Sequence, residues 1–295
     1  MMQGTIVKGI GGFYYVATAK GVYECRARGK FRRMRLVPTV GDQVEISVQD
    51  EQKKKGSVDE ILPRKNQLIR PKVANVDQAV IVFAAKSPDM NLDLLDRFLL
   101  LGEEQKLELV FCINKIDLDE KKQYEAVAAL YEQAGFPVVC VSGEKKENLE
   151  ALRAHLKGKI SVFAGPSGVG KSSLLNALNP ALSLNTGAIS EKIERGKHTT
   201  RHAELMELEE GSYIVDSPGF TSLSLEHILP EDLAGLFREF QPYLKDCYYR
   251  SCKHLQEPDC GVKAQVGKAI SQQRYERYVT ILGELEELQE RKNWK

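Results

Sequence analysis

Several features that would place this 295-residue chain in a special class are missing from it. It has no apolar run long enough to cross a bilayer, which argues against a helical membrane protein. Its first residues, MMQGTIVKGIGG, lack the charged-then-apolar build of a signal peptide. We therefore expect a soluble, cytoplasmic protein that does not act at a membrane and is long enough for two or three domains.

The chain as a whole also lacks an excess of either charge, since its formal net charge is only +1. The charges are nevertheless placed unevenly. Residues 1–72 carry 15 Lys and Arg against 7 Asp and Glu, whereas residues 73–223 carry 16 against 22. The basic N-terminal part favours a polyanionic partner, although a charged surface is often only a solvated one.

Cysteine is scarce, and its six copies are spread unevenly. Cys25, Cys112 and Cys140 stand singly in apolar or strand-like stretches, where small buried thiols are expected. Three further cysteines lie close together between residues 247 and 260. In a cytosolic chain such a cluster favours a metal site over disulfides.

The pattern of apolar residues predicts a multidomain protein. Residues 1–68 contain five short alternating runs, typical of a small OB-fold β-barrel. Residues 69–223 contain apolar runs separated by helical segments, which predicts an α/β domain with a doubly wound parallel sheet. Residues 224–295 are predicted to form helices around the cysteine-rich loop. The expected strands are 5–9, 13–19, 21–27, 42–48, 57–62, 79–85, 107–113, 137–141, 159–165 and 212–216, and the expected helices are 91–105, 121–135, 148–156, 225–240 and 264–291.

The segment GPSGVGKSS at 165–173 has the form of a nucleotide-binding phosphate loop, because it follows an apolar strand and precedes a helical segment. Its glycines let backbone N–H groups close around phosphate oxygens at a helix start. Lys171 is expected to reach the β- and γ-phosphates, and Ser172 to bind Mg²⁺. A glycine-rich turn with a chance GKS is less favoured, since every position and both flanks agree. The predicted contacts are Gly165, Pro166, Ser167, Gly168, Val169, Gly170, Lys171, Ser172 and Ser173.

The segment NKID at 114–117 lies earlier in the chain and has the form of a guanine-reading element. A carboxylate at Asp117 can accept hydrogen bonds from the ring N–H and the exocyclic amine of guanine, which adenine does not offer in that arrangement. A lone N-K-x-D could instead cap a helix. Here PVVCVSGE follows, and the backbone of Ser142 and Gly143 can support the guanine carbonyl. The predicted base contacts are Asn114, Lys115, Asp117, Ser142 and Gly143.

Two further motifs follow the phosphate loop. GKHTT at 196–200 carries a pair of threonines, and DSPG at 216–219 carries Asp216, expected to hold Mg²⁺ through water, and Gly219, expected to sense the γ-phosphate. The five GTPase motifs are all present, but the guanine elements (G4 and G5) precede the phosphate elements (G1, G2 and G3). The order along the chain is therefore G4-G5-G1-G2-G3. Circular permutation explains this order, because strands pair in space whatever their order in sequence.

With these motifs the chain resembles a known family, the bacterial circularly permuted GTPases of the RsgA (YjeQ/YloQ) type. The resemblance covers nearly the whole chain and rests on NKID, GPSGVGKSS, GKHTT, DSPG and the cysteine cluster. It implies hydrolysis of GTP to GDP and phosphate, with Mg²⁺ bound to the nucleotide. It also implies binding to the small (30S) ribosomal subunit and its 16S-type rRNA, stimulation of hydrolysis by that subunit, and a role in late subunit maturation. We expect a monomer.

The hydrolytic step requires a partner for the attacking water. Many GTPases place a Gln directly after D-x-x-G, but this chain has Phe220 there. His198 is the expected replacement, because an imidazole can accept a proton or hold a water, and the family resemblance points to the same residue. The alternative is that His198 is only an exposed polar loop residue. Thr200 is the expected contact to Mg²⁺ and the γ-phosphate, with its neighbour Thr199 as the alternative.

The cysteine-rich loop CYYRSCKHLQEPDC offers Cys247, Cys252, His254 and Cys260. Three thiolates and one imidazole can close a tetrahedral Zn²⁺ shell with no position left for water, which marks a structural site. The alternative is three reduced cysteines on a turn with an exposed histidine. The single residue between Cys252 and His254 is unusual for a generic zinc finger but agrees with the resembled family.

The basic barrel is predicted to bind RNA through its strand face and loops. Individual aromatic residues could equally be barrel core or strand surface. The family resemblance makes rRNA of the small subunit the expected ligand. The expected phosphate contacts are Arg32, Arg33, Arg35, Arg64, Lys65, Arg70 and Lys72, and the expected base contacts are Phe13, Tyr14, Tyr15 and Phe31.

Two other functions remain open at this point. The first is a non-hydrolytic, GTP-sensing RNA-binding adaptor in which Phe220 marks lost catalysis. The second is a metabolic nucleotide kinase with the same phosphate loop. It is disfavoured because N-K-x-D selects guanine and no lid for an acceptor substrate is evident.

Overall fold

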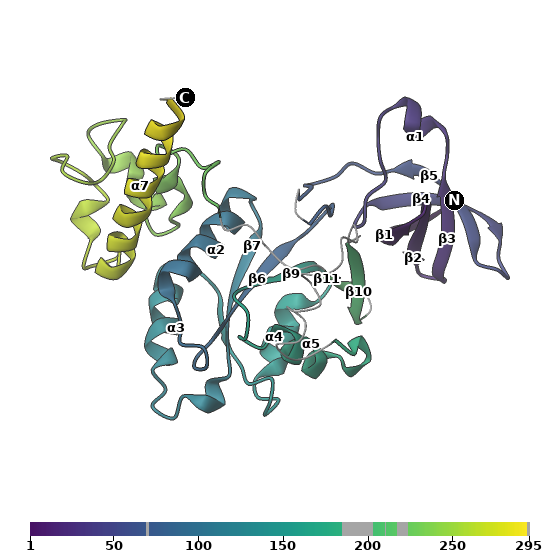
Figure 1. The fold of residues 1–295 in the computed structure, drawn as a ribbon, viewed down its shortest axis with the longest axis horizontal. Helices are drawn as coiled ribbons and strands as arrows, with labels where there is room; N and C mark the ends of the chain where they lie inside the picture. The colour runs from purple at the N-terminus through teal and green to yellow at the C-terminus, as the bar shows by residue number, and fades with distance from the viewer. Residues whose placement is uncertain (69–70, 185–202, 210, 217–223, 294–295) are drawn as a thin grey trace. The chain divides into compact units, whose positions relative to one another are not determined.

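The computed structural model describes residues 1–68, 71–184, 203–209, 211–216 and 224–293 (Figure 1). These residues belong to two compact units. One contains Met1–Val80, Leu149–Ala164 and the described part of 171–221. The other contains Ile81–Asn148, Gly165–Gly170 and the described part of 222–295.

The N-terminal strands form a closed barrel in the order β1-β2-β3-β5-β4, with β1 also pairing with β4 (purple in Figure 1). All pairs are antiparallel except β3 with β5. Alternate side chains point inward, and seven of them are completely buried: Ile6, Val16, Tyr23, Cys25, Val44, Ile46 and Val58. The OB-type barrel predicted from the alternating runs is confirmed. Its elements are β1 (Met2–Ile10), β2 (Phe13–Thr18), β3 (Gly21–Ala27), α1 (Lys30–Arg33), β4 (Gln43–Asp50) and β5 (Lys55–Ile61).

The remaining strands form a six-stranded sheet in the order β10-β11-β9-β6-β7-β8. β11 is parallel to β9 and β7 is parallel to β8, whereas β10 is antiparallel to β11. Every residue of β6 and of β9 is buried, as their largely apolar sequences predict. The strands are β6 (Gln78–Ala84), β7 (Glu108–Asn114), β8 (Val138–Cys140), β9 (Ile160–Ala164), β10 (Glu204–Glu209) and β11 (Ser212–Asp216).

The strand order shows the permutation directly. β9 leads into the phosphate loop, yet three strands of the sheet precede it in the chain. Counting from β9 as the first strand and continuing through β11 to β6, the sheet reads 2-3-1-4-5-6, which is a doubly wound order. A single helix, α4, leads from β8 to β9 and closes the permuted connection.

The predicted helices of this part of the chain are confirmed, while the antiparallel strand β10 was not anticipated. Its sequence, ELMELE, is half charged and lacks the apolar run that marked the other strands. Asn91 caps α2, since its side chain accepts a hydrogen bond from the Leu94 N–H at 3.0 Å. The elements are α2 (Leu92–Glu104), α3 (Tyr124–Gln133), α4 (Leu149–Leu156) and α5 (Lys171–Leu178), with short 3₁₀ turns at Ile116–Leu118 and Pro180–Leu182.

The C-terminal segment contains one long helix, α7 (Gln272–Asn293), drawn in yellow in Figure 1. The helix predicted at 225–240 is wrong, because only Leu233–Leu236 has helical form there and it is 3₁₀. Pro230 interrupts the segment, and its turns close through hydrogen bonds that span three residues rather than four. The helix predicted at 264–291 begins later, after a 3₁₀ turn at Lys263–Gln265, and a further 3₁₀ turn spans Gln241–Asp246.

Packing rather than helical hydrogen bonding holds the segment that precedes α7. Phe237 and Phe240 are fully buried, stack on one another at 5.1 Å between ring centroids, and meet Tyr278 of α7 edge-on. Aromatic contacts of this kind add to the free energy gained by burying apolar area. The segment therefore shares one hydrophobic core with α7.

A buried ion-pair network also holds α7. Arg274 donates to Glu239 at 2.6 Å through Nε and to Asp96 of α2 through Nη1, and all three side chains are at most 3% exposed. Asp96 also accepts hydrogen bonds from Arg277 and from the Tyr131 hydroxyl of α3. Burial acts to lower the pKa of Arg274, but the two carboxylates outweigh it and raise that pKa. The guanidinium therefore stays charged inside the protein.

Candidate functional site

The phosphate loop, residues 165–170, depends on glycine for steric reasons. Gly165 has φ +139°, and a Cβ atom there would lie 2.1 Å from the Val82 carbonyl oxygen at the neighbouring strand β6. Gly170 has φ +90°, and a Cβ there would lie 2.7 Å from Asn114 Nδ2. A side chain at either position would collide with groups that have no room to move. The loop is thus closed against the ends of β6 and β7.

Asn114 joins three segments of the chain at this point. It is the last residue of β7 and only 2% exposed. Its Nδ2 donates to the Val169 carbonyl at 2.9 Å, and its Oδ1 accepts from the Gly143 N–H at 3.1 Å. The structure therefore brings the predicted guanine element, the predicted phosphate loop and the turn after β8 together through one amide.

Lys115 makes a second connection to the phosphate loop. Its backbone is left-handed, with φ +60°. Its ammonium donates to the Gly168 carbonyl at 2.6 Å and to the Ser87 carbonyl. The Ser87 contact could not have been foreseen from the sequence, because a backbone carbonyl gives no signal in residue type.

Asp117 is half-buried beside the turn that follows β8. The Ser142 hydroxyl donates to its Oδ1, and the same hydroxyl accepts from the Lys145 N–H at 3.0 Å. Ser142 is itself fully buried. These bonds orient the carboxylate that the sequence assigns to guanine.

Some of the remaining predicted nucleotide residues are described by the structure, and others are not. Lys171, Ser172 and Ser173 begin α5, directly after the phosphate loop, where the helix start concentrates N–H groups. Pro166 and Ser167 lie within the loop. Asp216 ends β11, and its side chain is not described. His198, Thr199, Thr200 and Gly219 lie outside the described residues.

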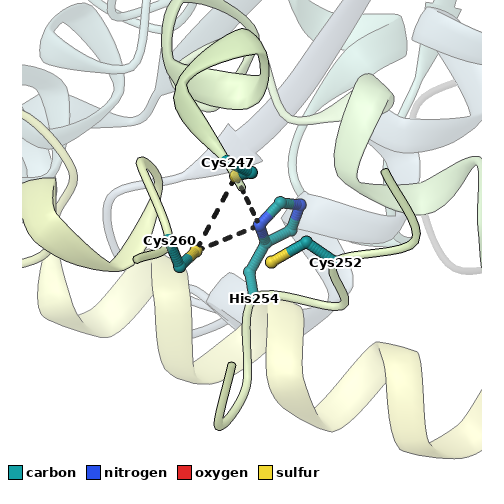
Figure 2. Close-up of side chains that lie close together, drawn as sticks. All are labelled: Cys247, Cys252, His254 and Cys260. Carbon is teal, nitrogen blue, oxygen red and sulfur yellow. Dashed lines mark hydrogen bonds between the residues drawn. The ribbon is translucent and has the colours of Figure 1, made fainter. Parts of the chain in front are cut away.

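The four predicted metal ligands come together in one cluster (Figure 2). Their ligand atoms all lie within 4.8 Å of one another. The Cys247 and Cys260 sulfurs are 3.9 Å apart, and His254 Nδ1 lies 3.6 and 3.3 Å from them. A tetrahedral Zn²⁺ with bonds of about 2.3 Å to sulfur and about 2.0 Å to nitrogen would separate its ligands by roughly 3.5–3.8 Å. The geometry therefore fits zinc.

The surroundings of the cluster favour a bound cation. Burial lowers the pKa of His254, which keeps the imidazole neutral and able to ligate. Burial and the neighbouring sulfurs raise the pKa of Cys252 to about 12, so the thiolates need a compensating positive charge. The Lys263 N–H already donates to the Cys260 sulfur at 3.4 Å.

The loop that carries the ligands is fixed from α7 and from within. The Tyr275 and Tyr278 hydroxyls donate to the carbonyls of His254 and Lys253 at 2.6 and 2.9 Å. The Glu257 carboxylate accepts hydrogen bonds from the N–H groups of Lys253, Leu255 and Gln256. Sequence analysis missed these supports, since a tyrosine on a helix face or a glutamate in a loop is ordinary.

The aromatic residues predicted to bind RNA on the barrel are only partly available. Phe31 is 4% exposed and belongs to the core, so its prediction as a stacking residue is wrong. Phe13, Tyr14 and Tyr15 are half-buried on β2. The Arg26 guanidinium lies over the Phe13 ring, 4.5 Å from its centroid. This pair presents a cation and an aromatic ring together, and Arg26 was not among the predicted contacts.

The predicted basic contacts also divide. Arg64 donates two hydrogen bonds, of 2.6 and 2.8 Å, to the fully buried Asp42. Its guanidinium therefore stabilises the barrel and is not available to bind a phosphate. Lys65 pairs with Asp77. Arg33, Arg35 and Lys72 are exposed. The Arg32 side chain and Arg70 are outside the described part of the chain.

Comparison with known proteins decides the family. The model of the RsgA GTPase matches residues 61–226, and the model of the RsgA N-terminal domain matches residues 3–57. This chain belongs to the RsgA GTPase family. A relative named small ribosomal subunit biogenesis GTPase RsgA, from Alkaliphilus metalliredigens, is 50% identical over 97% of this chain and 98% of its own length. Another of that name, from Caldanaerobacter subterraneus, is 49% identical over 99% of this chain and 98% of its own.

Two solved structures have the same fold as this RsgA-family chain. YjeQ from Thermotoga maritima superimposes with a TM-score of 0.83 and 39% identity, over 96% of this chain and 98% of that one. YloQ, described as a circularly permuted GTPase, gives a TM-score of 0.81 and 38% identity, over 97% of this chain and 96% of that one. The permuted GTPase fold predicted from the motif order is therefore confirmed. Among the described helices, none has the length and apolar character needed to cross a membrane.

Proposed function

We propose that this GTPase hydrolyses GTP to GDP and phosphate while bound to the small ribosomal subunit, and that it acts in late subunit maturation. The relatives' name supports the subunit as partner. The observation that carries the nucleotide site is the Asn114 amide, which binds the phosphate loop and the turn after β8 at once. We further propose that the protein acts in the cytoplasm as a monomer, and that its three functional domains are residues 1–68, 69–223 and 224–295.

The base of GTP is held, in this proposal, by the Asp117 carboxylate and by the backbone of Ser142 and Gly143. The carboxylate accepts from the two N–H groups of guanine, and the Ser142 hydroxyl keeps it turned toward the base. The backbone N–H groups of 165–170 surround the phosphates, and Lys171 neutralises the β- and γ-phosphates. Mg²⁺, when bound, neutralises the charge that develops on the phosphates. The residues that would hold the ion are Ser172 through its hydroxyl, Asp216 through water, and Thr200 or its neighbour Thr199.

Hydrolysis requires a group that orients the attacking water. Phe220, which follows D-S-P-G, cannot do this, so His198 takes the role in this proposal. The Gly219 N–H then reports the γ-phosphate. Replacing His198 by Ala is expected to lower turnover by about 10²-fold or more, with GTP affinity retained. His202→Ala, a histidine in the same segment, is the matched control.

The cluster of Cys247, Cys252, His254 and Cys260 binds one structural Zn²⁺ in this proposal. The charge and ligand set support it, because three thiolates and a neutral imidazole complete a closed shell. The exposed basic residues Arg33 and Arg35 of the barrel and Lys72 just after it, together with the Arg26–Phe13 pair, contact rRNA of the small subunit in this proposal.

The test combines GTP turnover with pelleting of small ribosomal subunits. We expect turnover that rises when purified subunits are added, and co-sedimentation of the protein with them. Asp117→Asn should abolish the preference for GTP over ATP in competition, because an amide cannot accept both guanine N–H groups. A protein that pellets with subunits but never turns GTP over would instead be the non-hydrolytic adaptor. Turnover of ATP at the same rate as GTP would contradict the assignment of Asp117.

A further inference from the structure

The barrel and the strand β10 meet through an ion pair. The Lys8 ammonium donates to Glu204 Oε1 at 2.9 Å and lies 2.7 Å from Oε2. Both residues belong to the same compact unit, in which β1 packs against β10. The contact joins residues 196 positions apart in the chain. It is therefore a link between the predicted RNA-binding barrel and the GTPase sheet.

Strand β1 of the barrel is irregular next to Lys8. The pairing of β1 with β2 shifts by one residue between Ile6, opposite Val16, and Lys8, opposite Tyr15. A bulge of this kind bends a strand and re-aims the side chains that follow it. The extra residue thus lies next to the lysine that reaches Glu204.

Glu204 occupies a sensitive position on the other side of the link. It is the first residue of β10, and it pairs across the sheet with Asp216, the predicted magnesium contact at the end of β11. In the sequence it stands four residues after Thr200 and six after His198. A shift of β10 at its first residue would therefore act on β11 at Asp216, the residue that pairs with Glu204.

We propose that Lys8 is a positioning residue, which couples occupancy of the barrel to the rate of GTP hydrolysis by holding Glu204 at the start of β10. This inference rests on the proposed function, because it explains how a small subunit bound at the barrel stimulates hydrolysis. Lys8 is not one of the predicted nucleotide contacts, and its ammonium binds Glu204. It acts on the register and position of β10 at its first residue.

The pair is suited to a modest and adjustable coupling. The Lys8 and Glu204 side chains are 35% and 40% exposed, so water screens their attraction and the pair contributes little to stability. An ion pair of this kind can change a coupled rate by about two- to fivefold. Binding of the small subunit can therefore strengthen or break the Lys8–Glu204 pair with little change in the free energy of unfolding. The coupling is reciprocal for binding, so a GTP analogue is expected to change subunit affinity through the same contact.

Charge reversal tests the inference in the full-length protein. Lys8→Glu and Glu204→Lys should each lower the stimulation of turnover by saturating small subunits by about two- to fivefold. In Lys8→Glu, which changes a residue of the barrel alone, basal turnover and affinity for a GTP analogue should stay unchanged. The double reversal, Lys8→Glu with Glu204→Lys, should restore stimulation. Lys20→Glu makes the same charge change on an exposed part of the barrel, where the Lys20 ammonium lies 3.9 Å from Glu51 Oε1, and should leave stimulation intact.

The double reversal separates coupling from RNA binding. It keeps the acidic residue at position 8, so a loss caused by weaker rRNA contact would persist in it, whereas a loss caused by the broken pair would disappear. Lys8→Met removes the charge without reversing it and should give a smaller loss if the fold is intact by circular dichroism. Wild-type stimulation in Lys8→Glu, or no recovery in the double reversal, would overturn the inference alone. No stimulation of the wild-type protein would overturn both the inference and the proposed function.

Discussion

The phosphate loop, residues 165–170, and the loop of residues 247–260 that carries the predicted metal ligands, called the Cys–His loop below, are held in shape in different ways. Both are irregular segments whose backbone must keep one shape. The phosphate loop is held by neighbouring side chains of the protein, because Asn114 and Lys115 donate to the carbonyls of Val169 and Gly168. The Cys–His loop gathers its own side chains around a point, with four ligand atoms within 4.8 Å.

The difference teaches how each loop responds to its ligand. A loop held by the protein keeps its shape before the nucleotide arrives, so binding costs little ordering of the chain. In a loop whose cysteines converge on one point, the thiolates would repel one another without a cation, so we expect its shape to depend on the proposed metal. We therefore expect the phosphate loop to be preorganised and the Cys–His loop to fold with its ion.

Removal of zinc should give the largest effect and tests the comparison most severely. Structural Zn²⁺ contributes about 10–16 kcal/mol of apparent binding free energy in small zinc-binding peptides, so its loss should unfold the region around residues 247–260. Hydrogen exchange after treatment with a chelator should show lost protection there, with protection in β6 and β7 retained. Cys252→Ser should behave in the same way and should lower the zinc content measured by atomic absorption.

The matched control is Cys140→Ser, which changes a half-buried cysteine outside the cluster and should leave zinc content unchanged. If the chelated protein kept full protection at 247–260, that loop would be as preorganised as the phosphate loop, and the comparison would fail.

The Arg274 network tests whether the C-terminal segment depends on its metal alone. Arg274→Met keeps the apolar stem but leaves Asp96 and Glu239 buried without their shared partner. Breaking a buried pair costs about 3–5 kcal/mol, and the lower figure is expected here because Asp96 keeps Arg277 and Tyr131. Urea unfolding of the zinc-loaded protein, followed at α7 by hydrogen exchange, measures the change in free energy.

Arg291→Met is its control on the same helix. Arg291 pairs with Glu287 at 3.5 Å, but both side chains are at least 70% exposed, so the free energy of unfolding should change by less than about 0.5 kcal/mol. Equal losses in the two variants would show that burial of the network contributes nothing.

The sequence was most informative where residue types and chemistry coincide. Three features could be recognised from residue type and spacing, because few other residues can replace them. They are the glycines of the phosphate loop, the N-K-x-D element and the four predicted metal ligands. The buried strands β6 and β9 were equally clear, because largely apolar runs of this length are typical of strands buried on both faces. These elements sufficed to predict the fold, including its permuted order.

The errors have the opposite cause. Residues 225–240 have helical spacing of apolar side chains, but Phe237 and Phe240 take their positions from packing against α7, which no local pattern records. Arg64 was predicted to contact phosphate, but it binds Asp42, a residue 22 positions away in the chain that no local pattern connects with it. Contacts made by backbone carbonyls, such as Ser87 with Lys115, are invisible in the sequence.

The Asn114 amide tests preorganisation of the phosphate loop, with an effect smaller than those above. Asn114→Ala removes both hydrogen bonds and leaves the Val169 carbonyl and the Gly143 N–H without that partner. Each unmade buried bond costs about 1–3 kcal/mol, and we expect affinity for a fluorescent GTP analogue to fall by at least about tenfold. Asn179→Ala is the control, because Asn179 also joins two segments, donating to the Leu208 carbonyl at 2.9 Å. It should lower stability without changing GTP affinity, and equal affinities in all three proteins would refute preorganisation by Asn114.

Lys115 gives the smallest expected effect and the sharpest control. Lys115→Met removes the ammonium that joins Ser87 to Gly168, but water can reach the freed carbonyls, so GTP affinity should fall only about fivefold, or roughly 1 kcal/mol. Lys122→Met changes the same residue type at the same left-handed backbone, since φ is +60° at Lys115 and +51° at Lys122. Lys122 pairs only weakly with Glu125, at 3.7 Å, and its change should leave affinity unaltered. If Lys115→Met lowered GTP affinity only through a slower association rate, the phosphate loop would close after GTP arrives. It would then resemble the Cys–His loop, because its shape would depend on its ligand.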